Sequence, residues 1–315
     1  MVPLLDRRLV FVTGKGGVGK TTVAAALGVL AASLGKRTLV GEVDAKGNLS
    51  DFFEIPATSF EPREVADDLY AMTMSTEDSL KEYLRLQLKL PLAGRLGPLA
   101  RTFDFVANAA PGVKEVLVVG KFLWEVRQRS YDLVIVDAVA TGHVIAQLAA
   151  PQALRELVKV GMVREQTGWM LELLGDPEVT GAVIVASPEE MPVNETLELS
   201  ERIVAETNVE LAAVVVNRVL PELFGRAEEE VFERLRSPAG VAALTAAVGS
   251  PVDRVLDAAE LAVTLRRTRV EHLTRLRTSL DRSVELLYVP ELFTRHHGVR
   301  ATRQVADALG AELGY

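Results

Sequence analysis

The chain has 315 residues, of which 49% are hydrophobic and only 5% aromatic, and its net charge at pH 7 is −8. This length suffices for one large α/β domain or two small ones with an aliphatic core. The acidic balance argues against a nucleic-acid partner, and the lack of cysteine excludes disulfides, thiolate zinc sites and a thiol nucleophile.

The N-terminal segment lacks an apolar stretch long enough for a signal peptide ahead of the first predicted strand. The sequence also lacks a run of about 18 uncharged apolar residues, the length that a membrane-spanning helix needs. We therefore expect a soluble, cytoplasmic protein without a transmembrane segment.

A glycine-rich loop follows the first predicted strand, 9–13, and precedes a predicted Ala- and Leu-rich helix, 21–34. It reads GKGGVGKTT from Gly14 to Thr22 and matches the phosphate-loop pattern G-x-x-x-x-G-K-[ST]. A strand, a glycine loop and a helix in this order direct backbone N–H groups and a helix N-terminus toward a polyphosphate. The alternative is a glycine-rich turn that only connects the strand to the helix.

The motif assigns roles to single residues. Lys20 is expected to reach the β- and γ-phosphates as a catalytic cation, and the Thr21 hydroxyl to coordinate Mg²⁺. The residues expected around the phosphates are Gly14, Gly16, Gly17, Val18, Gly19, Lys20 and Thr21.

Further predicted strands alternate with helical segments along the chain, at 37–43, 69–74, 131–137, 182–186, 211–217 and 284–289. Between 75 and 130 the composition is helical; residues 84–90 alternate with period two, but their propensity favours helix. Residues 218–277 are charged and mostly helical, as expected of a solvated outer face. The pattern predicts a single α/β domain, 1–315, with a doubly wound, mostly parallel sheet and an inserted helical subregion.

Polar residues end three of the predicted strands, namely Asp44, Asp137 and Asn217. Ligands of doubly wound sheets bind at the carboxyl ends of strands, so we expect one shared site. Asp137 is a candidate for the acid near Mg²⁺, Asp44 for orienting the attacking water, and Asn217 for a base edge. Each has an alternative as a turn or capping residue.

Lys15 is the second residue of the loop, where a generic phosphate loop does not require a lysine. It is either a solvated charge or a cation that crosses a dimer interface to the partner's nucleotide. Charge supplied in this way to a transferring phosphoryl group can be worth roughly 10³ to 10⁵ in rate.

Together these residues resemble the ArsA-type ATPase family of deviant phosphate-loop proteins, which includes the arsenite-pump ATPase and the guided-entry ATPases of tail-anchored membrane proteins. Bacterial, actinobacterial-like members are closest in character. Four segments carry the resemblance: the loop 15–21, the first-switch-like 44–51, the second-switch-like 137–143, and the VVVNR strand that ends at Arg218.

The resemblance implies an ATPase that uses ATP/ADP and Mg²⁺ and works as a homodimer or as a heterodimer with a related ATPase. Asp44 would position the attacking water, and Lys15 would reach across the dimer. Thr22 would touch the α-phosphate, Asn217 would read adenine, and Pro290 would pack near the base. Residues 137–143 would move with the γ-phosphate.

Two departures from the family limit what can be carried over. Both switch-like segments are altered, at 45–47 and at 138–140, so a slow or non-hydrolysing regulatory subunit of a heterodimer is an alternative. The arsenite site and the zinc bridge of the family both need cysteine. Its absence makes an arsenite pump an unlikely function and requires a dimer without zinc.

A client-binding surface is a further expectation, because the 75–129 segment is Leu-rich. Its helix-compatible apolar stripe comprises Leu92, Leu96, Leu99, Phe103 and Val106. The stripe either receives a hydrophobic membrane-protein helix or packs on the core.

A MinD-like positioning ATPase would need a basic amphipathic tail, but residues 300–315 carry two arginines and two acids. An ATP-dependent ligase of the same class is a further alternative, but the sequence shows no separate substrate signature for it.

Overall fold

The structure is a computed structural model that describes residues 2–43, 49–88, 112–294 and 298–315. In these ranges one eight-stranded sheet has the order β3-β4-β2-β5-β1-β6-β7-β8. Neighbouring strands are parallel, except that β3 pairs antiparallel to β4 at one edge. The strands are β1 (Leu9–Gly14), β2 (Thr38–Glu42), β3 (Arg63–Ala66), β4 (Leu69–Thr73), β5 (Leu133–Asp137), β6 (Thr180–Ala186), β7 (Leu211–Val219) and β8 (Glu285–Pro290).

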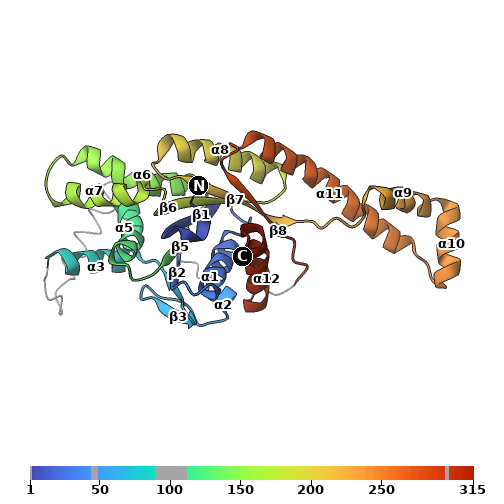
Figure 1. Cartoon of the computed structure of the whole chain (residues 1–315), viewed down its shortest axis with the longest axis horizontal. Helices are drawn as coiled ribbons and strands as arrows, with labels where there is room; N and C mark the ends of the chain where they lie inside the picture. The colour runs from blue at the N-terminus through green and yellow to red at the C-terminus, as the bar shows by residue number, and fades with distance from the viewer. Residues whose placement is uncertain (1, 44–48, 89–111, 295–297) are drawn as a thin grey trace.

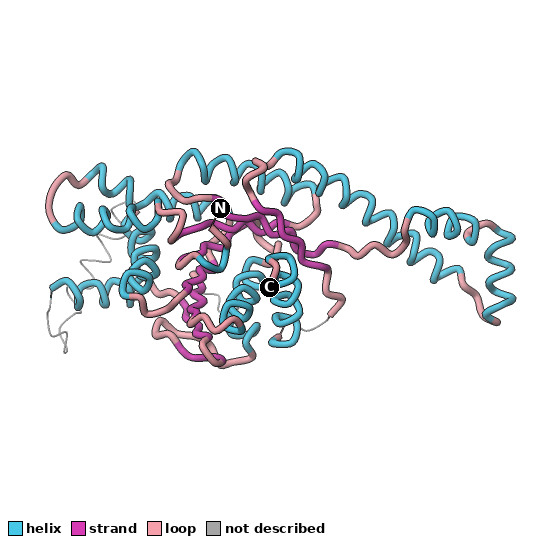
Figure 2. Tube along the Cα trace, in the orientation of Figure 1, coloured by secondary structure: helices cyan, strands magenta, loops and turns pink. Residues whose placement is uncertain are grey.

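Helices surround this sheet, which runs through the centre of the molecule (Figures 1 and 2). The helices are η1 (Leu4–Asp6), α1 (Lys20–Ser33), α2 (Leu49–Phe53), α3 (Thr76–Leu88), α5 (Val113–Gln128), α6 (Thr141–Leu157), α7 (Met162–Gly175), α8 (Glu190–Glu206), α9 (Arg226–Leu235), α10 (Pro238–Val248), α11 (Asp253–Ser279) and α12 (Val299–Leu313).

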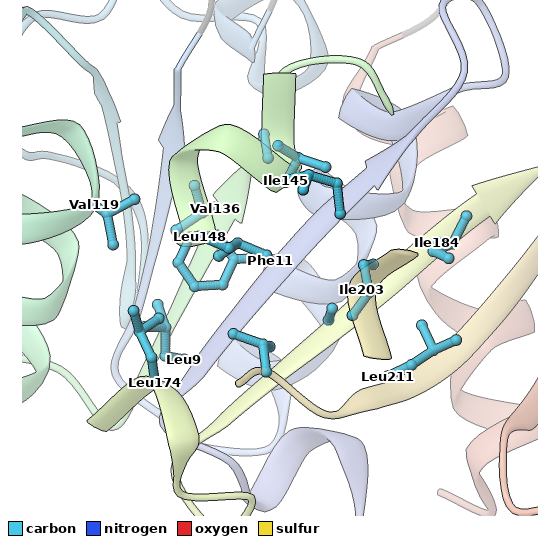
Figure 3. Close-up of a cluster of buried hydrophobic side chains, with 14 of the residues drawn as sticks. Leu9, Phe11, Val119, Val136, Ile145, Leu148, Leu174, Ile184, Ile203 and Leu211 are labelled. Carbon is cyan, nitrogen blue, oxygen red and sulfur yellow. The ribbon is translucent and has the colours of Figure 1, made fainter. Parts of the chain in front are cut away.

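Two aliphatic cores lie on opposite faces of the sheet. Leu9 and Phe11 of β1 pack with α5, α6, α7 and α8 on one face, as Figure 3 shows for part of this cluster. Val10 and Val12 pack with α1, α2 and α12 on the other face. Successive strand residues point to opposite faces, so a strand covered on both sides needs a continuous apolar run. This is why β1, β5 and β6 contain the unbroken apolar runs LVFV, LVIV and AVIVA.

The prediction of a doubly wound, mostly parallel α/β sheet is confirmed. The ends of the predicted strands differ from the observed ones by at most two residues. One strand was missed: β3 lies at the sheet edge and three of its four residues are exposed, so it has no apolar run. The segment 84–90 is helical as far as α3 extends, and the apolar stripe at 92–106 lies outside the described residues.

Helices α9, α10 and α11 project from the sheet as an arm, beyond the edge that carries β8 (Figure 1). Only the C-terminal part of α11 lies against α8. Residues 218–277, expected to be charged, mostly helical and solvated, contain α9, α10 and most of α11. Within them α10 (PAGVAALTAAV) carries no charge, and none of its residues is buried. Among the described helices, none is both long enough and apolar enough to cross a bilayer.

Candidate functional site

The glycine-rich loop joins β1, an inner strand of the sheet, to the N-terminus of α1. Gly14 and Gly19 both have positive φ, +146° and +98°, and both lie close against other residues of the fold. A Cβ on Gly14 would lie 2.2 Å from the Val185 carbonyl oxygen, and one on Gly19 would lie 2.3 Å from Asn217 Nδ2. Side chains are therefore excluded where the loop turns, and backbone N–H groups remain to line it.

The other loop residues fall into two groups. Gly16 and Gly17 are exposed at its tip, whereas Val18 is buried beneath it. Lys20, Thr21 and Thr22 form the first turn of α1, whose leading N–H groups have no partner within the helix. Such a turn binds anions through these N–H groups and the helix dipole. The loop therefore has the form of a phosphate cradle.

A carboxylate and a hydroxyl meet at the base of this cradle. The Thr21 hydroxyl donates a hydrogen bond of 2.6 Å to Asp137 Oδ2. Asp137 is 5% exposed and ends β5, the strand next to β1, where it lies in register with Val12. Hydroxyl and carboxylate oxygens suit Mg²⁺, which also retains water and phosphate ligands. The residues present therefore fit a magnesium ion beside the cradle.

Thr21 and Asp137 would supply only part of the coordination of a magnesium ion, so the candidate site is not one made of protein ligands alone. Within the described ranges, no group of three or more His, Cys, Asp or Glu side chains could hold a metal ion. An ion bound here would depend on phosphate and water for its remaining ligands, as is usual for magnesium in nucleotide sites.

The two loop lysines lie differently. Lys20 Nζ donates to the backbone carbonyl of Lys15 at 3.3 Å, so it curls back over the loop. Lys15 Nζ forms an ion pair with Glu195 of α8 in the same chain. Glu195 was not among the predicted site residues, because 180 positions separate it from Lys15 and no local pattern links the two.

A small pocket of about 40 Å³ brings together three residues that the sequence suggested separately, namely Thr22, Asn217 and Pro290. It lies between the ends of β7 and β8, the start of α1, and α12. Asn217 is 6% exposed; its Nδ2 donates to the Val18 carbonyl at 2.9 Å, and its Oδ1 accepts from Arg218 N–H at 3.0 Å. Asn217 thus ties β7 to the phosphate loop.

Asp44 lies outside the described residues. The chain on either side of 44–48 is placed at the carboxyl edge of the sheet. Val43 N–H donates to the Asp137 carbonyl at 3.1 Å, and Leu49 N–H donates to Glu42 Oε2 at 3.5 Å. Glu42 is 2% exposed, and sequence reasoning missed it, although an acid at the end of an apolar strand was a usable signal.

A second, larger pocket of about 280 Å³ lies away from the loop, between α3, α5, α6 and α7. Leu80, Val116, Trp124 and Met170 are among its mainly apolar lining residues, and the buried Lys121 is a charged exception.

Lys121 is held by charge on two helices. Its Nζ lies 2.8 Å from Glu82 of α3 and 2.8 Å from Glu125 of α5. Burial alone would lower the pKa of the Lys121 ammonium, but the hydrogen bonds that it donates to Glu125 and Glu82 outweigh this effect, and the pKa is raised. The charged lysine therefore joins α3 to α5 beside an apolar pocket.

Comparison with known proteins places this arrangement in a family. A sequence model of anion-transporting ATPases matches residues 7–174 and 157–237. The ATPase BagA of Mycobacterium tuberculosis is 32% identical over 305 residues, 90% of this chain and 86% of the relative. An ATPase ASNA1 homolog of Entamoeba dispar is 29% identical over 251 residues, 67% of this chain and 76% of the relative. The ATPase get3 of Neurospora crassa is 33% identical over 174 residues, about half of each chain (53% and 51%).

The family model spans most of the chain, and its match begins just before the strand that leads into the phosphate loop. The relatives carry the same activity in their names. This chain therefore belongs to the ArsA-type, anion-transporting ATPase family and is an ATP hydrolase.

Proposed function

We propose that the chain is a magnesium-dependent ATPase in which bound ATP drives the opening and closing of a dimer. The contact between Thr21 and Asp137 carries the proposal, because it sets a buried carboxylate beside a hydroxyl at the base of a phosphate cradle. Bound Mg²⁺ would supply positive charge against the phosphates. Thr21 would hold the ion directly, and Asp137 through a water.

The loop and the small pocket would bind different parts of the nucleotide. Backbone N–H groups from Gly14 to Thr22 would hold the phosphates, with Lys20 reaching the β- and γ-phosphates and Thr22 the α-phosphate. Asn217 and Pro290 line the small pocket, which would take the adenine. The Asn217 amide keeps one N–H and one lone pair beyond its two present bonds, enough to meet a base edge.

Asp44 and Lys15 would complete the site for hydrolysis. Asp44 would orient the attacking water. Lys15 would reach the nucleotide of a second subunit, either another copy or a related ATPase. To do so, its ammonium must leave Glu195, so the present pair represents a resting arrangement. The side chains of this pair are 26% and 33% exposed, so separating them costs little.

The pocket between α3, α5, α6 and α7 supports a second part of the proposal, the handling of a hydrophobic client. These helices lie between β4 and β6 along the chain, and α3 and α5 fall within the expected insertion at about 75–130 of a single domain. Apolar side chains that line an open pocket favour a partner with an apolar helix. We propose a membrane-protein segment as that client, met in the cytoplasm.

Steady-state ATP hydrolysis with Mg²⁺ tests the enzymatic part, together with the mass in solution with and without nucleotide. The key variant is Asp44→Asn, and the matched control is Asp67→Asn, which removes an exposed carboxylate from the β3–β4 turn. We expect the native chain and the control to hydrolyse ATP, the variant to bind ATP without turnover, and nucleotide to favour the dimer.

Two other outcomes would change the proposal. Tight ATP binding without turnover by the native chain would favour a regulatory subunit that needs an unlike partner. Equal turnover by the Asp44→Asn variant and the native chain would contradict the role given to Asp44.

Binding of a fluorescent peptide with about 20 apolar helical residues tests the client part. Val116→Glu places a charge in the pocket wall, and Val204→Glu places the same charge at a surface valine that is 71% exposed. We expect only Val116→Glu to weaken peptide binding. Equal binding by both variants would assign the pocket to core packing.

A further inference from the structure

The arm is joined to the small pocket by two arginines. Arg266 and Arg269 are one helical turn apart on α11 and therefore lie on the same side of the helix. Their side chains are 29% and 22% exposed, whereas the intervening Arg267 is 60% exposed. The two half-buried arginines point to the chain just after Asn217 rather than into solvent.

The segment around Asn217 forms an irregularity near the C-terminal end of β7. The pairing of β7 with β8 shifts between Val216 and Val219, which marks a bulge at Asn217 and Arg218. Arg218 has φ +62°, a left-handed conformation that a residue with a side chain rarely adopts. Bulges redirect side chains beside functional sites, and a strained residue persists only where its surroundings hold it.

The two arginines bind one carbonyl oxygen in the bulge and one just beyond the end of β7. Arg269 Nη1 donates to the Arg218 carbonyl at 3.2 Å, and Arg266 Nη1 donates to the Leu220 carbonyl. Each guanidinium also lies 3.8 Å from a carboxylate, Glu189 for Arg269 and Glu222 for Arg266. The bulge is therefore held from outside the sheet by charge-assisted bonds from α11.

The same bulge shapes the small pocket. Arg218 lines that pocket beside Asn217 and Pro290. Its N–H fixes the Asn217 side-chain oxygen at 3.0 Å, and the Asn217 amide in turn contacts Val18 of the phosphate loop. A shift of the bulge would therefore shift the Asn217 amide and change the pocket that Arg218 lines.

We propose that Arg266 and Arg269 are positioning residues for nucleotide binding, which hold the bulge and thereby fix the Asn217 amide and the pocket wall that would meet the base. The inference rests on the proposed function, because it takes the small pocket as the base site. It also couples the arm to the nucleotide site, because movement of α11 would move the arginines that hold the bulge.

The test compares two ligands that divide the site. MgADP uses both the phosphate cradle and the base pocket, whereas magnesium tripolyphosphate uses the cradle alone. Dissociation constants for both are measured by calorimetry on the full chain and on Arg266→Gln/Arg269→Gln, with Arg275→Gln as the control. Arg275 is an exposed arginine of the same helix, so the control removes one positive charge from α11, against two in the double variant.

We expect the double variant to bind MgADP about tenfold more weakly and tripolyphosphate within about twofold of the native chain, since only bonds at the base pocket are lost. Arg275→Gln should leave both constants unchanged. The single Arg269→Lys variant, which keeps a charged donor, should retain most of the ADP affinity.

Thermal melts and the single Arg269→Gln variant serve if the double variant folds poorly. Unchanged ADP affinity in a folded variant would overturn the inference, as would equal losses for both ligands. Failure of the native chain to bind either ligand would overturn the proposed function itself. Native binding of both ligands with no effect of the arginines would overturn only the positioning role.

Discussion

Substitution of Gly19 by alanine would press directly on the Asn217 side chain. Gly19 has φ +98°, where alanine is strained by about 1–2 kcal/mol, and the new Cβ would lie 2.3 Å from Asn217 Nδ2. The amide must move and lose its 2.9 Å bond to the buried Val18 carbonyl, at a cost of about 1–2 kcal/mol. We expect Gly19→Ala to lower the free energy of unfolding by about 2–4 kcal/mol.

A double-mutant cycle with Asn217→Ala isolates the contact. In the Asn217→Ala background the hydrogen bond is already lost and the space beside Gly19 is open. Gly19→Ala should then cost only the backbone strain, about 1–2 kcal/mol, which leaves a coupling energy of about 1–2 kcal/mol.

Urea unfolding of the native chain, both single variants and the double variant gives the cycle. Gly16→Ala is the control, because an added Cβ there meets nothing within 4 Å and the backbone is not left-handed. It should change the unfolding free energy by less than about 0.5 kcal/mol. Costs of Gly19→Ala that are equal in the two backgrounds would refute the reasoning from the Asn217 contact.

Two further predictions concern ion pairs. Lys121→Met should lower the unfolding free energy by about 2–4 kcal/mol in urea, because it leaves Glu82 and Glu125 beside an apolar pocket without their cation. Since the pKa of Lys121 is raised from 10.5, its contribution should be complete below that pH and fade only as pH rises through the raised pKa; a loss that vanished by pH 8 would contradict this. Glu195→Gln should change the unfolding free energy by less than about 1 kcal/mol, because its pair with Lys15 is partly exposed; a urea-measured loss above about 2 kcal/mol would contradict a weak, releasable pair.

The sequence was informative wherever one local pattern decided the structure. The apolar runs of β1, β5 and β6 predicted buried parallel strands, because both faces of such strands are covered. The phosphate-loop pattern identified the β1–α1 turn, because Gly14 and Gly19 occupy places where no side chain fits.

Features that depend on distant contacts were not predictable in this way. The exposed residues of β3 gave no periodic signal, and only pairing with β4 makes them a strand. The Lys15–Glu195 pair joins residues 180 apart. Residues 218–277 were expected to form a charged, mostly helical outer face. Within them α10 is apolar, and no sequence pattern showed that this helix would remain uncovered.

The magnesium dependence of ADP binding tests the central assignment most directly. Calorimetry would compare the dissociation constant of ADP with Mg²⁺ and with EDTA, for the native chain and for Asp137→Asn. If Thr21 and Asp137 form the magnesium site, Mg²⁺ should tighten ADP binding to the native chain, and the variant should lose most of that gain. An equal gain from Mg²⁺ in both proteins would contradict a metal role for this pair.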